Sequence, residues 1–159
     1  MNIQINANVP IFKEIDALVI ELKTYHFCSV DEYNKKIGSG ELVKKPVMAD
    51  DFEFAAKNPG HPLALNVRMK RIRCGDDILR KVRELESVVP DETLAGIHEL
   101  LFDCCPTIRL SMAEALSIIP SKDSIPHLKR LAETETESPM VKNATDQALA
   151  ACENFAMKA

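Results

Sequence analysis

The sequence predicts an all-α protein built as a short stack of helical hairpins, on three observations. First, a set of proline, apolar and basic positions recurs 33 residues later in the same order, which is typical of helical repeats. Second, only 5% of the residues are aromatic and Trp is absent, a composition that suits short, close-packed helices. Third, apolar residues recur at helical spacing. The recurring positions are Pro106, Ile108, Arg109, Ala115 and Leu116 in one copy and Pro139, Val141, Lys142, Ala148 and Leu149 in the next.

The best-defined hairpin begins at Pro106, since a proline fits the first turn of a helix. Its first helix is expected over 106–119, because Met112 and Leu116 fall on one apolar face and Pro120 ends the helical stretch. The elements predicted to follow are a turn at 121–123, a second helix over 124–133, an acidic loop at 134–137 and a further helix over 138–157.

A weaker copy of the hairpin is predicted upstream, over 76–105. Its first helix is expected to start at Asp76 and Asp77, because carboxylates suit a helix N-terminus. Gly75 is then expected to end a preceding helix over 62–73 as its C-cap. In the second helix, the spacing of Leu94, Ile97 and Leu100 matches that of Ile125, Leu128 and Leu131.

The first 60 residues do not show the period. They are predicted to form a non-repeat segment, 1–60, that packs on the repeats of 61–159 within a single compact domain. Whether this segment covers the binding face or extends it stays open at this point. The elements expected in it are a helix over 10–25, a short capped helix over 29–37, a break at 38–40 and a helical turn within 50–57.

The motif of 106–116, Pro-Thr-Ile-Arg-Leu-Ser-Met-Ala-Glu-Ala-Leu, followed by Asp-Ser-Ile-Pro-His-Leu at 123–128, resembles the HEAT-like repeats of phycobilin lyase subunits and bacterial scaffold proteins. The match is good over 106–152, weaker upstream and absent from the N-terminal third. The resemblance implies a short α-solenoid whose second helices line the concave, ligand-facing side. It also implies that Arg109 and Lys142 are recurrent structural residues of the first helices. It specifies architecture far better than function.

Composition and charge exclude several broad classes. The net charge of −4 and the isoelectric point near 5.6 argue against a general nucleic-acid binder, which needs a basic surface. The five cysteines are odd in number and contain no Cys-x-x-Cys pair, so neither a disulfide framework nor a zinc site is indicated. No stretch resembles a signal peptide or a membrane span, so we expect a cytoplasmic protein with no membrane partner.

The function predicted from this organisation is protein–protein interaction or scaffolding through the concave face of the stack. The partner is an unidentified protein, and no cofactor is expected. Weak self-association is a further hypothesis, through the C-terminal end that carries Phe155 and Met157. The residues predicted to contact the partner are His98, Glu99, Asp103, His127, Lys129 and Arg130.

One alternative is a lyase subunit or another enzyme that binds a small ligand. Deoxyhypusine hydroxylase has similar repeats and holds a di-iron centre through several His-Glu dipeptides, but this chain has one, His98-Glu99. A metal centre needs several converging ligands, so we expect neither a metal site nor catalytic residues. His26 and Cys28 lie close enough in sequence to be compared with a base and a nucleophile, but their spacing is not distinctive.

The other alternative is binding to a nucleic-acid backbone through a basic cluster between Arg68 and Arg83. Such a cluster can meet phosphates, but a charged run more often forms the solvated face of a helix. Because the chain is acidic overall and has no Trp to stack on a base, we do not expect nucleic acid as the partner. The basic cluster comprises Arg68, Lys70, Arg71, Arg73, Arg80, Lys81 and Arg83.

Overall fold

The computed structural model describes residues 3–24, 62–85, 88–103 and 105–158, with side chains described for 11–23 and from 69 onward. Three predicted elements lie outside the described residues: the capped helix at 29–37, the break at 38–40 and the helical turn within 50–57.

The described residues form six α-helices and one 3-10 turn, and they contain no strand. The all-α class is therefore confirmed for this part of the chain. None of these helices combines the length and the apolar character needed to cross a membrane. The elements are α1 (Ile3–Thr24), α4 (Pro62–Arg83), α5 (Asp91–Leu100), α6 (Pro106–Ile118), η1 (Lys122–Ser124), α7 (Ile125–Thr134) and α8 (Pro139–Lys158).

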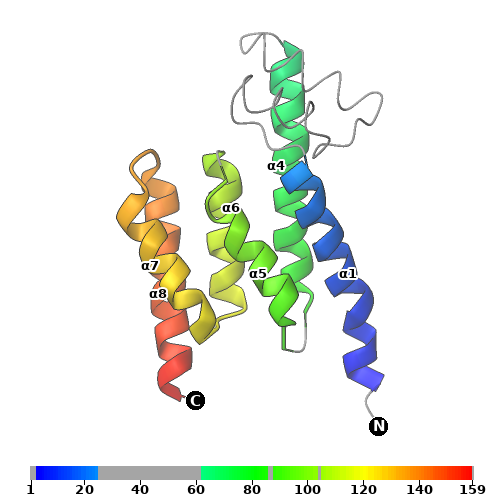
Figure 1. Cartoon of the computed structure of the whole chain (residues 1–159), viewed down its shortest axis with the longest axis vertical. Coiled ribbons are helices and arrows are strands. Elements are labelled where there is room, and N and C mark those ends of the chain that lie inside the picture. Colours follow the sequence, from blue (N-terminus) through cyan, green and yellow to red (C-terminus); the bar gives the residue numbers. More distant parts are fainter. Residues whose placement is uncertain (1–2, 25–61, 86–87, 104, 159) are drawn as a thin grey trace.

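The helices lie in two rows (Figure 1). In the back row, α6 stands between α4 and α8 and contacts both. In the front row, α1 packs on α4 and α5, α5 on α6, and α7 on α8. From α4 onward the chain alternates between the rows, which places α5 and α7 next to one another on the front of the molecule.

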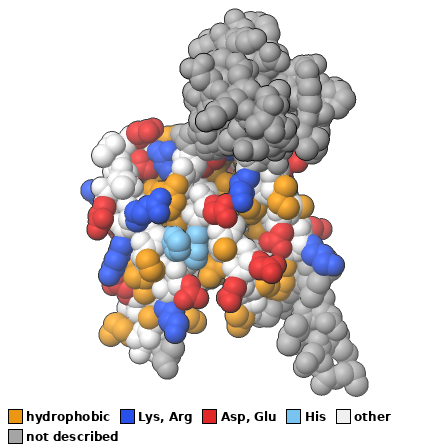
Figure 2. All heavy atoms as spheres, viewed as in Figure 1, with side chains coloured by type: hydrophobic (Ala, Val, Ile, Leu, Met, Phe, Trp, Pro, Cys, Tyr) orange, Lys and Arg blue, Asp and Glu red, His pale blue; other side chains and the backbone are white. Residues whose placement is uncertain are grey.

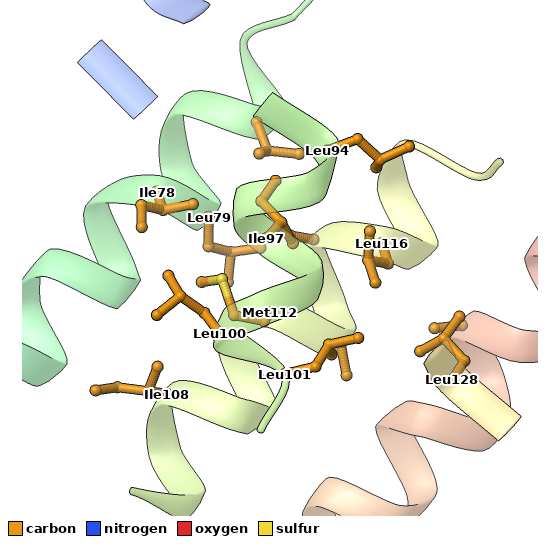
Figure 3. Packing of buried hydrophobic residues seen from close by; sticks show 14 of the residues in the cluster. Ile78, Leu79, Leu94, Ile97, Leu100, Leu101, Ile108, Met112, Leu116 and Leu128 are labelled. Carbon is orange, nitrogen blue, oxygen red and sulfur yellow. The ribbon is translucent and has the colours of Figure 1, made fainter. Parts of the chain in front are cut away.

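The core lies between the two rows and takes aliphatic side chains from all of the described helices. Figure 3 shows the part of it that lies between α4, α5, α6 and α7. The predicted face of α6 is confirmed, because Ile108, Met112 and Leu116 are fully buried. Each such side chain contributes about 1.5–3 kcal/mol of transfer free energy when it leaves water. Leu128 of α7 and Val141 of α8 are buried in the same core, so their predicted faces are confirmed as well.

The predicted helix break at Gly75 is wrong. Helix α4 runs without interruption from Pro62 to Arg83, so Asp76 and Asp77 lie inside a helix rather than at its start. A glycine costs up to about 1 kcal/mol in a helix interior. An added Cβ at Gly75 would lie 3.6 Å from Ile108 Cγ1 of α6, an ordinary contact distance, so the packing of α4 on α6 leaves room for a methyl group at this position.

Helix α1 begins earlier than the predicted 10–25. It starts at Ile3 and continues through Pro10. The apolar spacing that predicted it is confirmed, because Phe12, Ile15, Val19 and Leu22 are buried.

Two buried arginine–carboxylate pairs tie the front row to the back row. Arg71 of α4 donates to both carboxylate oxygens of Asp103, which follows α5, at 2.7 and 3.2 Å. Arg109 of α6 donates to both carboxylate oxygens of Glu135, which follows α7, at 2.8 and 3.1 Å. Arg109 also donates to the backbone oxygen of Asp103 at 2.8 Å. The same kind of contact therefore fixes the end of each front helix, α5 and α7, to the back-row helix before it.

Candidate functional site

A furrow runs between α5 and α7 on the front of the molecule. It consists of three hollows, which we call the lower, middle and upper hollows, and together the α5–α7 furrow. They follow one another along both helices. The lower hollow is lined by Asp91 and Leu94 on the α5 side and by Ser121 and Asp123 on the α7 side. The middle hollow is lined by Ala95, His98, Glu99 and Phe102 on the α5 side and by His127 and Arg130 on the α7 side. The upper hollow is lined by Phe102 and Asp103 on the α5 side and by Leu131, Thr134 and Glu135 on the α7 side.

The lower hollow has a volume of about 550 Å³ and is mainly apolar. Several of its side chains face solvent: Val88 is 91% exposed, Phe155 49% and Ile118 40%. Such large apolar side chains would normally be covered in a core, so the lower hollow is the main exposed apolar surface of the furrow. Its apolar lining is Leu85, Val88, Val89, Leu94, Ile118, Ile119, Pro120 and Phe155.

The middle hollow, of about 430 Å³, is bridged by two side-chain pairs that join α5 and its end to α7. The rings of His98 and His127 stack with their centroids 4.1 Å apart. The Arg130 guanidinium lies over the ring of Phe102, 4.0 Å from its centroid. In Figure 2 the described histidines, in pale blue, lie at the centre of this face, and acidic side chains gather on their α5 side. The acidic residues on α5 are Asp91, Glu92 and Glu99, all exposed.

His98 is held in its neutral form. Burial lowers its pKa from 6.5 to about 4, and the neighbouring His127 acts in the same direction against the opposing effect of Asp123. The Nε2 atom of His98 forms a hydrogen bond with the hydroxyl group of Ser124, at a distance of 2.8 Å between Nε2 and Oγ. At neutral pH His98 therefore stacks on His127 without contributing a charge, and it serves as a polar wall of the hollow.

The upper hollow, of about 180 Å³, lies over the ion pair of Arg109 and Glu135. Burial would raise the pKa of the Glu135 carboxyl, but the hydrogen bonds from Arg109 and from the backbone of Glu137 outweigh burial and lower it. Burial likewise opposes the charged form of Arg109, but Glu135 raises its pKa overall. Both groups are therefore ionised, and they hold the end of α7 in place.

The structure brings four of the six predicted contact residues together. His98, Glu99, His127 and Arg130 all line the middle hollow. Glu99 forms an ion pair with Lys23 of α1, the neighbouring helix of the front row. The alignment of the two second helices in sequence was sufficient to find this group.

The other two predicted contact residues lie elsewhere. Asp103 is 3% exposed and its carboxylate is bound by Arg71, so the prediction of an accessible contact at this position is wrong. Lys129 is exposed on α7 but does not line any of the three hollows. His98, at 7% exposed, contributes a wall of the furrow rather than a solvated surface residue.

Some members of the predicted basic cluster are buried or paired with carboxylates among the residues whose side chains are described, a set that leaves out Arg68. Arg71 is buried with Asp103. Arg80 pairs with Asp77 on the same helix, and Lys81 pairs with Glu14 of α1. Since α4 is one continuous helix with 3.6 residues per turn, Lys70, Arg73, Arg80 and Arg83 fall on one side of it, whereas Arg71 falls on another. The members that are exposed along it are Lys70, Arg73, Arg80 and Arg83.

Sequence reasoning missed Phe102 and the apolar lining of the lower hollow. Phe102 follows the last turn of α5, outside the helical stripe on which the prediction was based. The lower hollow is assembled from side chains of loops and several helices, so no single sequence period could reveal it.

The described residues contain no group of three or more His, Cys, Asp or Glu side chains placed to hold a metal ion. The described cysteines Cys74, Cys105 and Cys152 are free thiols. Burial raises the pKa of the Cys74 and Cys152 thiols, which makes both poor nucleophiles at neutral pH.

Comparison with known proteins found no matching family model, no matching curated protein and no matching solved structure. The resemblance to HEAT-like repeats stays a prediction.

Proposed function

We propose that the protein is a HEAT-like helical stack that binds a partner protein through the α5–α7 furrow. The observation that carries this proposal is the alignment of three hollows along two neighbouring helices. A row of hollows between two helices fits a segment of another protein, and laying a helix into a groove between helices is a recurrent mode of recognition. A small ligand is more often enclosed in a single deep cavity.

The two rows of helices support the HEAT-like part of the proposal. Helices α4 and α5 form one pair and helices α6 and α7 form another, and in each pair the first helix lies in the back row and the second in the front row. In each pair a back-row arginine binds a carboxylate just beyond the front-row helix, Arg71 with Asp103 and Arg109 with Glu135. A repeated stabilising contact of this kind is expected where one structural unit is used twice.

The contacts that anchor the walls of the furrow support a binding role. Its two walls are anchored at their ends by the buried ion pairs, and the stacked histidines bridge them in the middle. A surface that is already ordered loses little conformational entropy when a partner binds.

The proposal is tested by filling the middle hollow. Ala95 is exposed and lines this hollow, whereas Ala150 is exposed on α8 and lines none of the three. We expect Ala95→Trp to abolish capture of the partner in affinity purification from the native host, and Ala150→Trp to preserve it. Both variants should keep the helical circular-dichroism spectrum, because neither alanine is buried.

If all captured proteins bind Ala95→Trp as well as they bind the wild type, the furrow is not the binding site and the proposal is wrong. A small molecule that copurifies with the wild type and is absent from Ala95→Trp would instead identify the furrow as a ligand site.

A further inference from the structure

We infer that the partner of the α5–α7 furrow is an amphipathic helix that carries a large apolar side chain and a carboxylate two turns apart on one face. This inference rests on the proposed function and specifies the partner of the same site. It follows from the different chemistry of the lower and middle hollows and from the distance between them.

The lower hollow selects the apolar side chain. It is the largest of the three hollows, and Val88, Ile118 and Phe155 expose apolar surface around it. Asp91 and Asp123 also line it, at its α5 and η1 sides. A Leu, Met or Phe side chain of the partner would cover the exposed apolar surface, and each buried methylene would contribute favourably to binding. A carboxylate placed there would lose its hydration and would meet the carboxylates of Asp91 and Asp123, so this hollow does not suit the acidic side chain of the partner.

The middle hollow selects the carboxylate. Arg130 is exposed and its guanidinium is held over the Phe102 ring. Among the described residues Arg130 forms no ion pair, whereas Glu99 across the hollow already pairs with Lys23. His98 is neutral at pH 7 and does not compete for the anion. An Asp or Glu of the partner would therefore find an oriented cation, and Arg binds carboxylates through two parallel hydrogen bonds.

The spacing follows from helix geometry. Asp123, beside the lower hollow, and Arg130, in the middle hollow, are seven residues apart on the η1–α7 wall. At a rise of 1.5 Å per residue this is roughly 10 Å, which a partner helix also spans in about seven residues. Residues seven apart lie on nearly the same face of a helix. The apolar side chain and the carboxylate are thus expected at positions i and i+7, in either chain direction.

The experiment uses a phage-displayed library of 18-residue helices, in which the residues on the exposed face of each displayed helix are randomised. The library is selected against the full-length wild type, and the enriched helices are measured by fluorescence anisotropy against Arg130→Glu and Lys129→Glu. These two variants make the same charge change on neighbouring exposed residues of α7, and only Arg130 lines a hollow. We expect enriched helices to pair Leu, Met or Phe with Asp or Glu at i and i+7. Arg130→Glu should raise their Kd by about tenfold or more, and Lys129→Glu by less than about twofold.

The outcomes separate the two proposals. Enriched helices that lose binding to Ala95→Trp but lack the apolar–carboxylate pair would overturn the inference and leave the proposed function standing. Enriched helices that bind Ala95→Trp as tightly as the wild type would overturn both. If no helix is enriched, the inference is wrong because the furrow does not bind a helix of this class. If light scattering shows a dimer that Phe155→Ser abolishes, the inference is wrong because the furrow binds a second copy of this chain.

Discussion

At the scale of single residues, some polar side chains around the furrow hold the helices in place, and others are accessible to a partner. Arg109 and Glu135 are buried and paired, so they position α7 and are not available to a partner. Arg130 is exposed and lies in the furrow, so it is available. The sequence shows both arginines as basic residues at helical positions, and only burial distinguishes their roles.

Removing the charge of Glu135 should destabilise the protein strongly. Glu135→Gln leaves the buried Arg109 guanidinium with only the exposed Glu137 carboxylate, 3.7 Å away, and breaking a buried pair in this way costs about 3 kcal/mol. Glu133→Gln, at an exposed position of α7, should change the free energy of unfolding by less than about 0.5 kcal/mol. Urea denaturation at pH 7 measures both. Equal effects of the two substitutions would show that Glu135 does not hold α7.

His98 should make the stability depend on pH. The folded state holds the pKa of His98 at about 4, below its ordinary value of 6.5, so between these values the unfolded state binds the proton more readily. Its contribution is fully present above pH 6.5 and declines as the pH falls toward 4, by up to about 1.4 kcal/mol per pH unit. His98→Asn should flatten this slope between pH 6.5 and 4.5 in urea denaturation. An unchanged slope in the variant would contradict the neutral, buried state of His98.

At the scale of the elements, the helix starts predicted from prolines are confirmed, whereas the helix end predicted from a glycine is wrong. Helices α6 and α8 begin at Pro106 and Pro139 as predicted, because the ring of a proline at the first helical position is compatible with the helix and removes no hydrogen bond. Gly75 was interpreted as a helix end from its local sequence alone. In the structure Gly75 is a buried position inside α4 that faces α6, where the nearest side chain, Ile108, lies 33 positions away in the sequence.

One substitution tests whether Gly75 lies inside a helix with room for a methyl group. An added Cβ meets Ile108 at 3.6 Å, an ordinary contact, so Gly75→Ala should stabilise the protein by about 0.5–1 kcal/mol through higher helix propensity. At Gly96 the added Cβ would lie 3.0 Å from Val19 Cγ1, so Gly96→Ala should gain less or should destabilise. Thermal or urea unfolding measures both. Destabilisation by Gly75→Ala would contradict a helical position with room for a methyl group.

At the scale of the whole molecule, the class of the fold and the centre of the candidate site were accessible from the sequence. Aligning the two second helices was enough to group His98 and Glu99 with the α7 residues that share their hollow. The lower hollow was not accessible from the sequence, because it joins Val88, Ile118 and Phe155 from three separate parts of the chain. The burial of Asp103 was not accessible either, because its partner Arg71 was assigned to a solvated cluster.

Self-association through the C-terminal end stays a prediction. Phe155 is 49% and Met157 85% exposed, so apolar surface is available there. If this surface pairs two copies, Phe155→Ser should shift the protein toward the monomer in size-exclusion chromatography with light scattering. A wild type that is monomeric at high concentration would contradict the hypothesis.

The most direct test of the central claim, that the α5–α7 furrow binds a partner helix, is an NMR titration of the labelled protein with an enriched helix from the library. We predict amide shift changes in 88–102 and 118–135 and none in the exposed basic stretch of α4 from Arg73 to Arg83. Shift changes that fall on α4 and leave α5 and α7 unperturbed would contradict the account.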